Sequence, residues 1–483
     1  MTTRSIPVYT TGEICRIEAA AGETQPPLME RAGLAAADLA VRIMPEAGKD
    51  ILVLAGPGNN GGDARIAARI LAERFFRVTL VDAARGSAVP MDKRWALIID
   101  GLFGIGLARE VSGDYAKLID YANAQACRVL ALDIPSGLES DTGRVLGKAV
   151  HASHTITFIA QKPGLLTLDG PDLCGEIHVA DLGLDVRALL PPSGWIAGPD
   201  LFGHLLKPRA RNFHKGSAGS VAILGGAAGM CGAALLAGRA ALKLGAGKAF
   251  VGLLDPDAPS YDAGALELML RHPDEVLGLD LDALVVGPGL GDGERADTFV
   301  GAALASDIAC VLDADALNLM ALNRDLGDAC KRRSAETIIT PHPAEAARLL
   351  GSSTRAVQED RLAAAQALRE RFNAHVVLKG NGSVLSARDG HWFINTSGNP
   401  GMATAGMGDV LSGILGALLG QGYTGESALV LGTHLHGAAA DDCVANGTGP
   451  VGLTASEVAD AARRLWNGWL ENQAARTRAL GSG

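Results

Sequence analysis

The chain has 483 residues, of which 48% are hydrophobic and 20% are charged, and its formal net charge is −10. A chain of this length is too long to fold around a single hydrophobic core, so we expect two or three folded domains. The negative charge argues against a general nucleic-acid surface, which needs clustered lysine and arginine. It does not exclude anionic ligands, because backbone amides and helix ends bind phosphate without net positive charge.

The cysteines and the apolar runs of the sequence indicate the cellular compartment of the protein. The seven cysteines are dispersed and form no CxxC pair, which is typical of reduced thiols. The first twenty residues lack the apolar stretch of a signal peptide, and runs such as VLSGILGALL are shorter than the ~20 residues that a bilayer requires. We therefore predict a cytoplasmic protein that binds neither membrane nor nucleic acid.

The first half alternates short apolar strands with alanine-rich helices. The run at 50–58 ends in glycines, as a buried parallel strand does, and residues 62–75 carry apolar side chains at helical spacing. Further strands are expected at 77–83, 96–100 and 128–137. This βαβ order predicts a Rossmann-like, doubly wound α/β/α domain.

The same order restarts after a segment rich in proline, glycine and basic residues near 190–212. A strand and glycine loop at 219–229 precede a helix at 232–247, and strands are expected within 281–291, 309–318, 337–345 and 374–383. A last amphipathic helix is expected at 454–470. We place the domain boundary between residues 205 and 206, which gives domains of 1–205 and 206–483.

Polar residues follow three strands of the first half. GPGNNGGD (56–63) leaves a strand and opens a helix, so it is either an ordinary tight turn or a ligand-binding loop with exposed amides. Strand ends of a parallel sheet share one edge. The oxygen-bearing residues there are Asn59, Asn60, Asp63, Asp100, Asp133 and Ser136. Such hard ligands suit K⁺ or a hydroxyl-rich molecule better than zinc.

The motifs MERAG, GPGNNGGD, DGLFGIG, DIPSGLESDTG and TITFIAQKPGLL, in this order, resemble the NAD(P)H-hydrate epimerase domain over roughly the first 200 residues. The resemblance implies that K⁺ binds to Asn60, Asp100 and Ser136, and that Asp133 is a catalytic residue that contacts substrate. It further implies substrate contacts from Asn59, Asn60, Gly61, Gly62, Asp63, Gly104, Ile105, Gly106, Leu107, Ala108, Arg109 and Glu110. Ile105 replaces the usual threonine, and GLES replaces GLDA.

In the second half, NPGMATAGMGDVLSGILGALL (399–419) runs from a glycine loop into an apolar helix. Free amides and the helix dipole attract phosphate there, but they also stabilise an ordinary aspartate cap. The segment is not a P-loop, because it lacks GK[ST]. Neighbouring motifs favour phosphoryl transfer: LKGNGS supplies Lys379 and a second glycine turn, while DADALN and TPHPAE supply carboxylates and an imidazole.

Two other chemistries fit less well. No GxSxG elbow indicates a serine hydrolase. His434 and His436 fall in a helical run, where residues two apart do not share a face, so a metal pair is not expected.

The motifs HKGSAGSVAILGG, VVGPGLG, DADALN, TPHPAEAARLLG, VVLKGNGS and NPGMATAGMGD together resemble the NAD(P)H-hydrate dehydratase domain over about 206–470. This resemblance implies a ribokinase-like α/β fold and, with the first domain, a bifunctional nicotinamide-nucleotide repair enzyme. Phosphorylation of the C6 hydroxyl by ADP, with Mg²⁺, would make a good leaving group and regenerate NADH or NADPH. We also expect a homo-oligomer.

The implied roles in this domain are specific. Asp409 would be the catalytic base and contact the substrate. The hydrate would also contact Ala233, Gly289 and His342, and the nucleotide would contact Lys379, Gly380, Asn381, Gly382, Ser383 and Gly408. Met407 replaces the usual threonine, and HPAE replaces HPGE. The alternatives are a ribokinase-like kinase of small alcohols, which leaves the first domain unexplained, and a non-catalytic binding protein.

Overall fold

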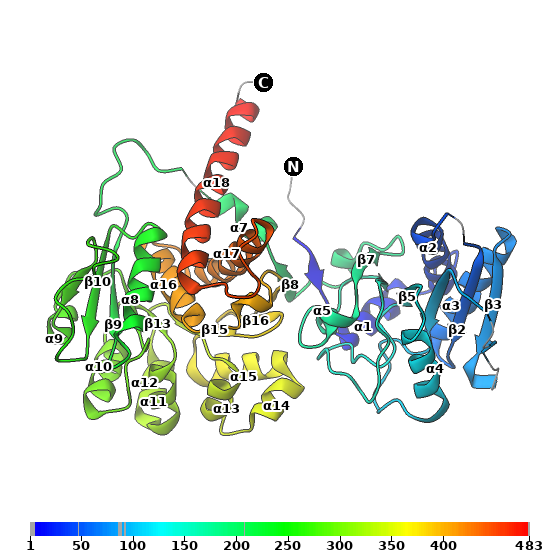
Figure 1. Ribbon diagram of the computed structural model, residues 1–483, viewed down its shortest axis with the longest axis horizontal. Coiled ribbons are helices and arrows are strands. Elements are labelled where there is room, and N and C mark those ends of the chain that lie inside the picture. The colour runs from blue at the N-terminus through cyan, green and yellow to red at the C-terminus, as the bar shows by residue number, and fades with distance from the viewer. Residues whose placement is uncertain (1–4, 47, 86–88, 91–92, 207, 482–483) are drawn as a thin grey trace. The chain divides into compact units, whose positions relative to one another are not determined.

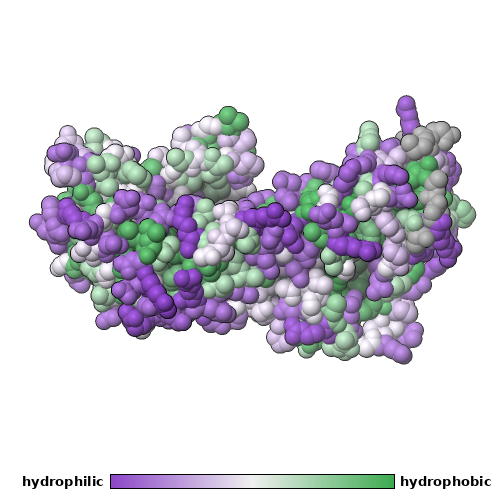
Figure 2. Space-filling view, turned by 90° about the horizontal axis from the view of Figure 1, so that it is seen from below, coloured by the Kyte–Doolittle hydropathy of each residue, from purple (hydrophilic) through white to green (hydrophobic). Residues whose placement is uncertain are grey.

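The computed structural model describes residues 5–46, 48–85, 89–90, 93–206 and 208–481. Contacts divide the chain into two compact units, one spanning Ile6–Trp195 and one that begins at Ile196. Figure 1 shows the elements of each unit, and Figure 2 shows hydrophilic residues over much of the visible face of both. Among the described residues, no helix has the length and apolar character needed to cross a bilayer.

The N-terminal unit is built on a six-stranded sheet with the order β3-β2-β4-β5-β6-β7, in which all neighbours are parallel. Its strands are β2 (Asp50–Ala55), β3 (Arg77–Asp82), β4 (Leu97–Gly101), β5 (Arg128–Leu132), β6 (His154–Phe158) and β7 (Glu176–Ala180). The sequence runs through β2 before β3 and β4, so the order reverses beside β2, as in a doubly wound sheet.

Helices cover both faces of this sheet. They are α1 (Thr11–Ala21), α2 (Leu28–Ile43), α3 (Asn59–Glu73), α4 (Gly113–Asn123), α5 (Gly170–Leu173) and α6 (Val186–Leu189), with 3₁₀ turns at Ala83–Arg85 and Pro163–Leu165. Along β2, Ile51 and Val53 pack with α2 and α3, whereas Leu52 and Leu54 pack with α4. The continuous apolar strand is therefore explained by burial on both faces. A short antiparallel pair joins β1 (Pro7–Val8) and β8 (Gly194–Ala197).

The C-terminal unit contains a second sheet, in which β17-β16-β15-β14-β13-β12-β9-β10-β11 are neighbours. These strands are β9 (Ser220–Gly225), β10 (Lys248–Leu253), β11 (Met269–Arg271), β12 (Ala283–Val286), β13 (Ala309–Leu312), β14 (Thr337–Ile339), β15 (His375–Leu378), β16 (Ser383–Ser386) and β17 (Trp392–Asn395). Only the β15–β16 and β16–β17 pairs among these are antiparallel. The carboxyl ends of the parallel strands therefore lie along one edge.

The helices of this unit form layers on its sheet (Figure 1). One apolar core joins the sheet to α10 (Glu294–Ala305), α11 (Asp315–Leu322), α12 (Arg324–Arg332), α13 (Pro343–Leu350), α14 (Thr354–Glu359) and α15 (Arg361–Phe372). The remaining helices are α7 (Pro199–Phe202), α8 (Cys231–Lys243), α9 (Pro273–Val276), α16 (Met407–Gly420), α17 (Gly425–Ala445) and α18 (Ala455–Gly481), with 3₁₀ turns at Gly203–Leu205 and Pro400–Met402.

Helix α16 lies unusually close to α8 and to the sheet because its contact positions are glycines. A Cβ added at Gly413 would lie 2.1 Å from the carbonyl oxygen of Ala237 in α8. One added at Gly416 would lie 2.5 Å from Val285 of β12. These glycines fix how far the first turn of α16 reaches over the edge of the sheet.

We expect Gly413→Ala to destabilise the C-terminal unit by about 1–3 kcal/mol, because the added methyl group overlaps a backbone oxygen that cannot rotate away. Urea unfolding monitored by tryptophan fluorescence measures the change. The matched control is Gly468→Ala in α18, where a Cβ meets nothing within 4 Å. That change should stabilise the unit by about 0.5–1 kcal/mol through helix propensity. Equal effects of both substitutions would contradict the close-packing argument.

Candidate active sites

The first candidate site lies where the glycine loop enters α16. Gly406 is the N-cap and has φ of +85°, a left-handed conformation that glycine adopts without strain. Asp409 lies in the first turn and is half-buried. Burial, with a smaller contribution from the negative charge of Asp313, raises the pKa of Asp409 to about 6. Within the described part of the chain, its carboxylate accepts no hydrogen bond, so it can accept a proton from a ligand.

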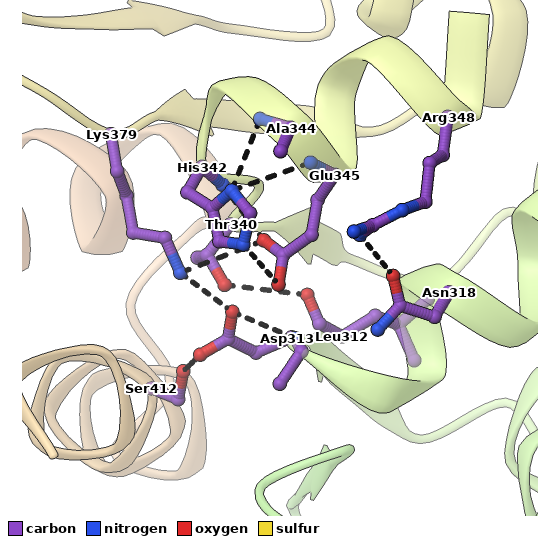
Figure 3. Close-up of polar contacts among 11 residues, drawn as sticks. Leu312, Asp313, Asn318, Thr340, His342, Ala344, Glu345, Arg348, Lys379 and Ser412 are labelled. Carbon is purple, nitrogen blue, oxygen red and sulfur yellow. Dashed lines mark hydrogen bonds and ion pairs between the residues drawn. The ribbon is translucent and has the colours of Figure 1, made fainter. Parts of the chain in front are cut away.

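An ion pair between Asp313 and Lys379 lies next to this turn, and Figure 3 shows its contacts. Asp313 follows β13, and its side chain is 2% exposed. Its Oδ1 accepts a hydrogen bond from Lys379 Nζ at 2.9 Å, and its Oδ2 accepts one from Ser412 Oγ at 2.7 Å. Lys379 follows β15 and Ser412 belongs to α16. Asp313 therefore joins three separate chain segments at the carboxyl edge of the sheet.

Asp313 and Lys379 each shift the pKa of the other toward the ionised form. Burial alone would raise the pKa of Asp313, but Lys379, Ser412 and Thr340 together lower it. Burial alone would lower the pKa of Lys379, but Asp313, Glu345 and Asp409 raise it. Both groups are therefore ionised at neutral pH. One ammonium group faces three carboxylates here, which leaves a net negative site for a cation to neutralise.

The approach of Lys379 to α16 depends on Gly408. A Cβ at this position would lie 3.3 Å from Lys379 Nζ and 3.5 Å from Asp313 Oδ2. The structure thus brings together Lys379, Gly408 and Asp409, three of the predicted site residues. Met407, the departure from the family pattern, is 6% exposed and packs inside the protein.

The other predicted nucleotide-binding residues form the tight turn between β15 and β16. Gly380 and Gly382 have φ of +148° and +61°, and Ser383 Oγ donates to the carbonyl of Gly380 at 3.0 Å. Asn381 is exposed at the tip of the turn, whereas Gly382 is buried. The turn presents backbone groups at the same edge as Asp409.

A buried arginine stabilises this turn through hydrogen bonds to its backbone. Arg361 is 1% exposed, and its Nη2 donates to the carbonyls of Leu378 and Lys379 at 3.2 and 3.3 Å. Burial lowers its pKa to about 10, so it remains charged at neutral pH. A Cβ at Gly380 would lie 2.5 Å from Arg361 Nη1, which explains glycine there.

His342 and Glu345 form a reciprocal cap at the start of α13 (Figure 3). His342 Nδ1 accepts from the backbone amides of Ala344 and Glu345, and Glu345 Oε2 accepts from the amide of His342 at 2.8 Å. Burial, with the charge of Lys379, lowers the pKa of His342. The imidazole is therefore neutral, carries its proton on Nε2, and is 47% exposed toward solvent.

Ala233 and Gly289 adjoin each other, because a Cβ at Gly289 would lie 3.3 Å from that of Ala233. Gly289 has φ of +58° and accepts a hydrogen bond from the amide of Ala227 at 2.6 Å. An open cavity of about 320 Å³ lies beside the loop that precedes Gly406. Its lining residues are Pro400, Gly401, Ala403, Thr404, Pro450, Val451, Gly452 and Leu453.

The second candidate site lies at the carboxyl edge of the N-terminal sheet. Asp133 follows β5 with φ of +64°, and its Oδ1 forms an ion pair with Lys162 Nζ. Lys162 is 1% exposed, and its ammonium group also donates to Thr157 Oγ1 at 2.7 Å and to the carbonyl of Phe158 at 2.8 Å. All three ammonium hydrogens are thus used, and Asp133 is held rigidly.

Two further carboxyl groups face this pair. Burial, together with the charges of Asp133 and Glu18, raises the pKa of Asp63 to about 8. Burial and the charge of Asp133 also raise the pKa of Glu18. Asp63 is therefore mostly protonated at neutral pH, next to the ion pair of Asp133 and Lys162. A proton donor and a carboxylate acceptor lie in one site.

Asn60, Asp100 and Ser136 also converge at this edge. Asp100 is fully buried and accepts from Ser136 Oγ at 2.7 Å, from the Ser136 amide at 2.8 Å and from the Leu102 amide at 3.2 Å. Burial raises its pKa to about 6 despite these bonds. Asn60 Nδ2 donates to the carbonyls of Phe103 and Leu132, but its buried Oδ1 has no hydrogen-bond partner. An unpaired buried oxygen beside a buried carboxylate suits a cation.

The NNGGD motif is the first turn of α3 rather than a loop before it. Asn59 is exposed, whereas Asn60, Gly61 and Asp63 are buried. Gly61 is sterically required, because its Cβ would lie 1.9 Å from the carbonyl oxygen of Gly56. Gly62 has Met29 as its nearest neighbour, with the sulfur 2.7 Å from an added Cβ.

The predicted loop at 104–110 meets the site only at its start. A Cβ at Gly104 would lie 3.2 Å from Asn60 Cβ and 3.4 Å from Asp133 Oδ2. Ile105 packs against the core of α2 and α3, and Leu107 packs against the core of α4. The remaining residues, Gly106, Ala108, Arg109 and Glu110, are exposed.

Sequence reasoning missed several residues that these sites depend on. Lys162 lies within a quoted motif but was not assigned a role, and Glu18 lies in none. Asp313 and Glu345 were noticed as carboxylates at strand ends without an assigned partner, and Ser412 was not noticed. A lysine or acid that follows a strand motif is the only available signal, because the partners are 29 to 99 residues apart.

The fold and these sites define a two-unit α/β enzyme, with a Rossmann-like unit and a ribokinase-like unit. A family model described as "NAD(P)H-hydrate dehydratase" matches residues 221–464, and one described as "YjeF-related protein N-terminus" matches residues 25–96 and 86–164. A "ribokinase-like superfamily protein" from Enterococcus faecalis, 23% identical, aligns with 57% of this chain and 96% of its own with a TM-score of 0.51. The ADP/ATP-dependent NAD(P)H-hydrate dehydratase of Bacillus subtilis is 28% identical and aligns over 57% of this chain and 98% of its own, with a TM-score of 0.49.

Full-length relatives match both units. The bifunctional NAD(P)H-hydrate repair enzyme of Coxiella burnetii is 38% identical over 94% of this chain and 98% of its own length. The bifunctional NAD(P)H-hydrate repair enzyme of Escherichia coli is 38% identical over 91% of this chain and 89% of its own length. The chain belongs to the family of bifunctional NAD(P)H-hydrate repair enzymes. The sequence-based predictions of this family, of a bifunctional enzyme and of the two α/β folds are confirmed.

We expect Asp313→Asn to destabilise the C-terminal unit by about 1–3 kcal/mol, because it removes the main counterion of the Lys379 ammonium group, while Glu345 and Asp409 remain near it. Chemical unfolding of the purified protein measures the loss. The double substitution Asp313→Asn with Lys379→Met removes both charges, and it should recover most of the stability. If the double variant is less stable than the single variant by the full cost of Lys379→Met alone, the two groups are not energetically coupled.

Proposed function

We propose that residues 206–483 form an ADP-dependent dehydratase domain for the S epimer of hydrated NADH and NADPH, and that residues 1–205 form a domain that interconverts the R and S epimers. The family assignment supports both activities. The observation that carries the dehydratase assignment is the convergence of Asp409, Lys379 and Gly408 at one sheet edge.

In the dehydratase domain, Asp409 would accept the proton of the C6 hydroxyl while that oxygen attacks the β-phosphorus of ADP. AMP leaves, the C6–O bond then breaks to release phosphate, and a proton is lost from C5 to that phosphate, which restores the dihydropyridine. A carboxylate with a pKa near 6 is ionised at neutral pH and is more basic than an ordinary aspartate. Its position in the first turn of α16 also directs the helix amides toward the phosphates.

Lys379 and the turn Gly380–Ser383 would hold the nucleotide, with Gly408 giving close access to the α16 backbone. Lys379 supplies a positive charge fixed by Asp313. Mg²⁺ would neutralise phosphate charge when it is bound, and the carboxylate of Glu345 beside Lys379 is an oxygen donor that suits it. Ala233, Gly289 and His342 would line the hydrate site, where the Nε2 proton of His342 can be donated.

In the epimerase domain, Asp133 would contact the substrate and act with Asp63. The protonated carboxyl of Asp63 can donate to the C6 hydroxyl, and the ionised Asp133 can accept a proton. The residues at 59–63 and 104–110 would surround the nicotinamide nucleotide. K⁺ would be held by Asn60, Asp100 and Ser136, and it would satisfy the unpaired Oδ1 of Asn60. When bound, K⁺ supplies a positive charge that favours the ionised form of Asp100.

The test of the dehydratase is the return of reduced-nicotinamide absorbance after hydrated NADH is mixed with enzyme, ADP and Mg²⁺. Asp409→Asn should lower the rate by at least about 100-fold, since it removes the base, and it should leave nucleotide binding by calorimetry nearly unchanged. For the wild type, the rate should fall as the pH drops below about 6, because protonation of Asp409 removes the acceptor.

The matched control is Asp280→Asn, an exposed aspartate of the same unit, which should keep the wild-type rate. Absence of NADH recovery with the wild type would refute the dehydratase proposal. An active Asp409→Asn protein would remove Asp409 from the base role and leave it as a helix cap.

The epimerase proposal is tested with Asp133→Asn, since asparagine tolerates the positive φ of this position. The variant should use the S epimer at the wild-type rate but convert the R epimer at least about 100-fold more slowly. Separate time courses with each epimer, in excess ADP and in a buffer that contains K⁺, measure this difference.

Asp114→Asn, an exposed aspartate in α4, serves as the matched control and should leave both rates unchanged. If Asp133→Asn slows both epimers equally, or neither, Asp133 does not act in epimerisation.

A further inference from the structure

Two histidines and a glutamate meet on one face of the N-terminal sheet, at the opposite end of β6 from Lys162 and the candidate active site of that unit. His154 begins β6, and Glu176 and His178 lie on the neighbouring strand β7. In the parallel register His154 lies opposite Glu176, and His178 follows two residues later on the same face. Their ligand atoms all lie within 4.8 Å of one another.

The spacing of these atoms does not suit hydrogen bonds. His178 Nε2 is 3.4 Å from Glu176 Oε1, and His154 Nε2 is 4.0 Å from Glu176 Oε2. His178 Nε2 is buried and has no hydrogen-bond partner, although it points toward a carboxylate. Donors bound to one tetrahedral Zn²⁺ at 2.0–2.1 Å lie about 3.4 Å apart. The gap between His178 and Glu176 matches this spacing, and the rings of His154 and His178, which now stack with centroids 5.8 Å apart, would turn to bring both nitrogens to one ion.

The tautomer of His154 is also suited to metal binding. Ser153 Oγ donates to the carbonyl of Val129 at 3.0 Å, and it lies 3.0 Å from His154 Nδ1. The bond from Ser153 to Val129 uses the serine proton, which favours the tautomer of His154 that carries its hydrogen on Nδ1. In that tautomer the lone pair of Nε2 is available to the cluster, and metal-bound histidines commonly donate their other ring hydrogen in this way.

The two strand ends are held together before any ion arrives. The Glu176 amide donates to the carbonyl of Ser153 at 3.0 Å. Gly175 has φ of +58°, and a Cβ there would lie 2.1 Å from that same carbonyl oxygen. The backbone is thus preorganised for ligands from both strands. Glu176 is 69% exposed, so its carboxylate can turn to the ion without moving the core.

One positive group faces the cluster. Arg128 lies on β5 and lowers the pKa of His154, after the effects of burial, Glu176 and His178. Its guanidinium donates to the carbonyl of Ile43, at the negative end of the α2 dipole, which offsets part of its charge.

A second cluster in the described chain makes a useful contrast. His391 Nδ1 is 2.9 Å from Asp389 Oδ2, an ordinary hydrogen-bond distance, with Glu426 3.9 Å away. That histidine is already paired, whereas the nitrogen of His178 is not. The two clusters lie in different units, so one serves as a control for the other.

We propose that His154, Glu176 and His178 form a binding site for a divalent transition-metal ion of the zinc type, with water in the fourth position. The ion ties the edge strand β7 to β6. The site lies at the opposite end of β6 from Asp133, about 13 Å away along four residues of strand. Its role is therefore to stabilise the unit, and it is independent of the proposed chemistry.

The test uses the full chain without a histidine tag, treated with a chelator, desalted and titrated with Zn²⁺ alone by calorimetry. The wild type should bind one Zn²⁺ ion at this site. His178→Gln and Glu176→Gln should each lower the affinity of the site for Zn²⁺ by at least about tenfold, because each removes a ligand. His391→Gln and Cys15→Ser should bind Zn²⁺ at this site with the wild-type affinity. The first substitution alters only the other cluster, and the second removes an exposed thiol.

Two further readouts separate metal binding from folding. Circular dichroism of the metal-free variants should match the wild type, and saturating Zn²⁺ should raise the unfolding temperature of the wild type but not of His178→Gln. Absence of Zn²⁺ binding by the wild type would overturn the proposal. So would unchanged affinity in His178→Gln, or loss of binding only in His391→Gln or Cys15→Ser.

Discussion

Each unit depends on a buried aspartate–lysine pair at the carboxyl edge of a parallel sheet. Asp313 and Lys379 form it in the C-terminal unit, and Asp133 and Lys162 form it in the N-terminal unit. A buried ion pair is not in itself an efficient source of stability, because both charges lose their hydration. Its structural effect is to fix two strand ends relative to each other. In the C-terminal unit, Ser412 extends this effect to the first turns of α16.

The pairs also set the acidity of their neighbours. Burial raises the pKa of Asp409 and of Asp63, and the negative charge of Asp313 or Asp133 adds to this effect, so the two values lie near 6 and 8. Burial and two other acids raise the pKa at both positions, but Lys379 lowers it at Asp409, and no such positive charge acts among the causes at Asp63. One group is thereby a base at neutral pH and the other an acid. The same arrangement supports two different proton-transfer roles.

The N-terminal sheet has polar clusters at both ends of its strands. At the carboxyl end of β6, backbone and side-chain groups converge around Lys162, as is typical of parallel sheets. At the other end, His154 and β7 meet through Gly175, and the unpaired nitrogen of His178 indicates an ion. The apolar core between the ends, which contains Ile156, separates the two chemically.

The sequence by itself determined the two α/β units, their alternating strands and helices and the family, because apolar periodicity and glycine-rich motifs are local features. It also singled out Asp409, Lys379 and Asp133. It described NNGGD as a loop into a helix, whereas the helix already begins at Asn59. The roles assigned to individual site residues stay predictions. Only the tertiary structure decided that Asp313 joins Lys379 to Ser412, and that Lys162 holds Asp133. Partners 29 to 99 residues apart share no local pattern, and burial, which shifts their pKa values, arises only when the strands and helices pack together.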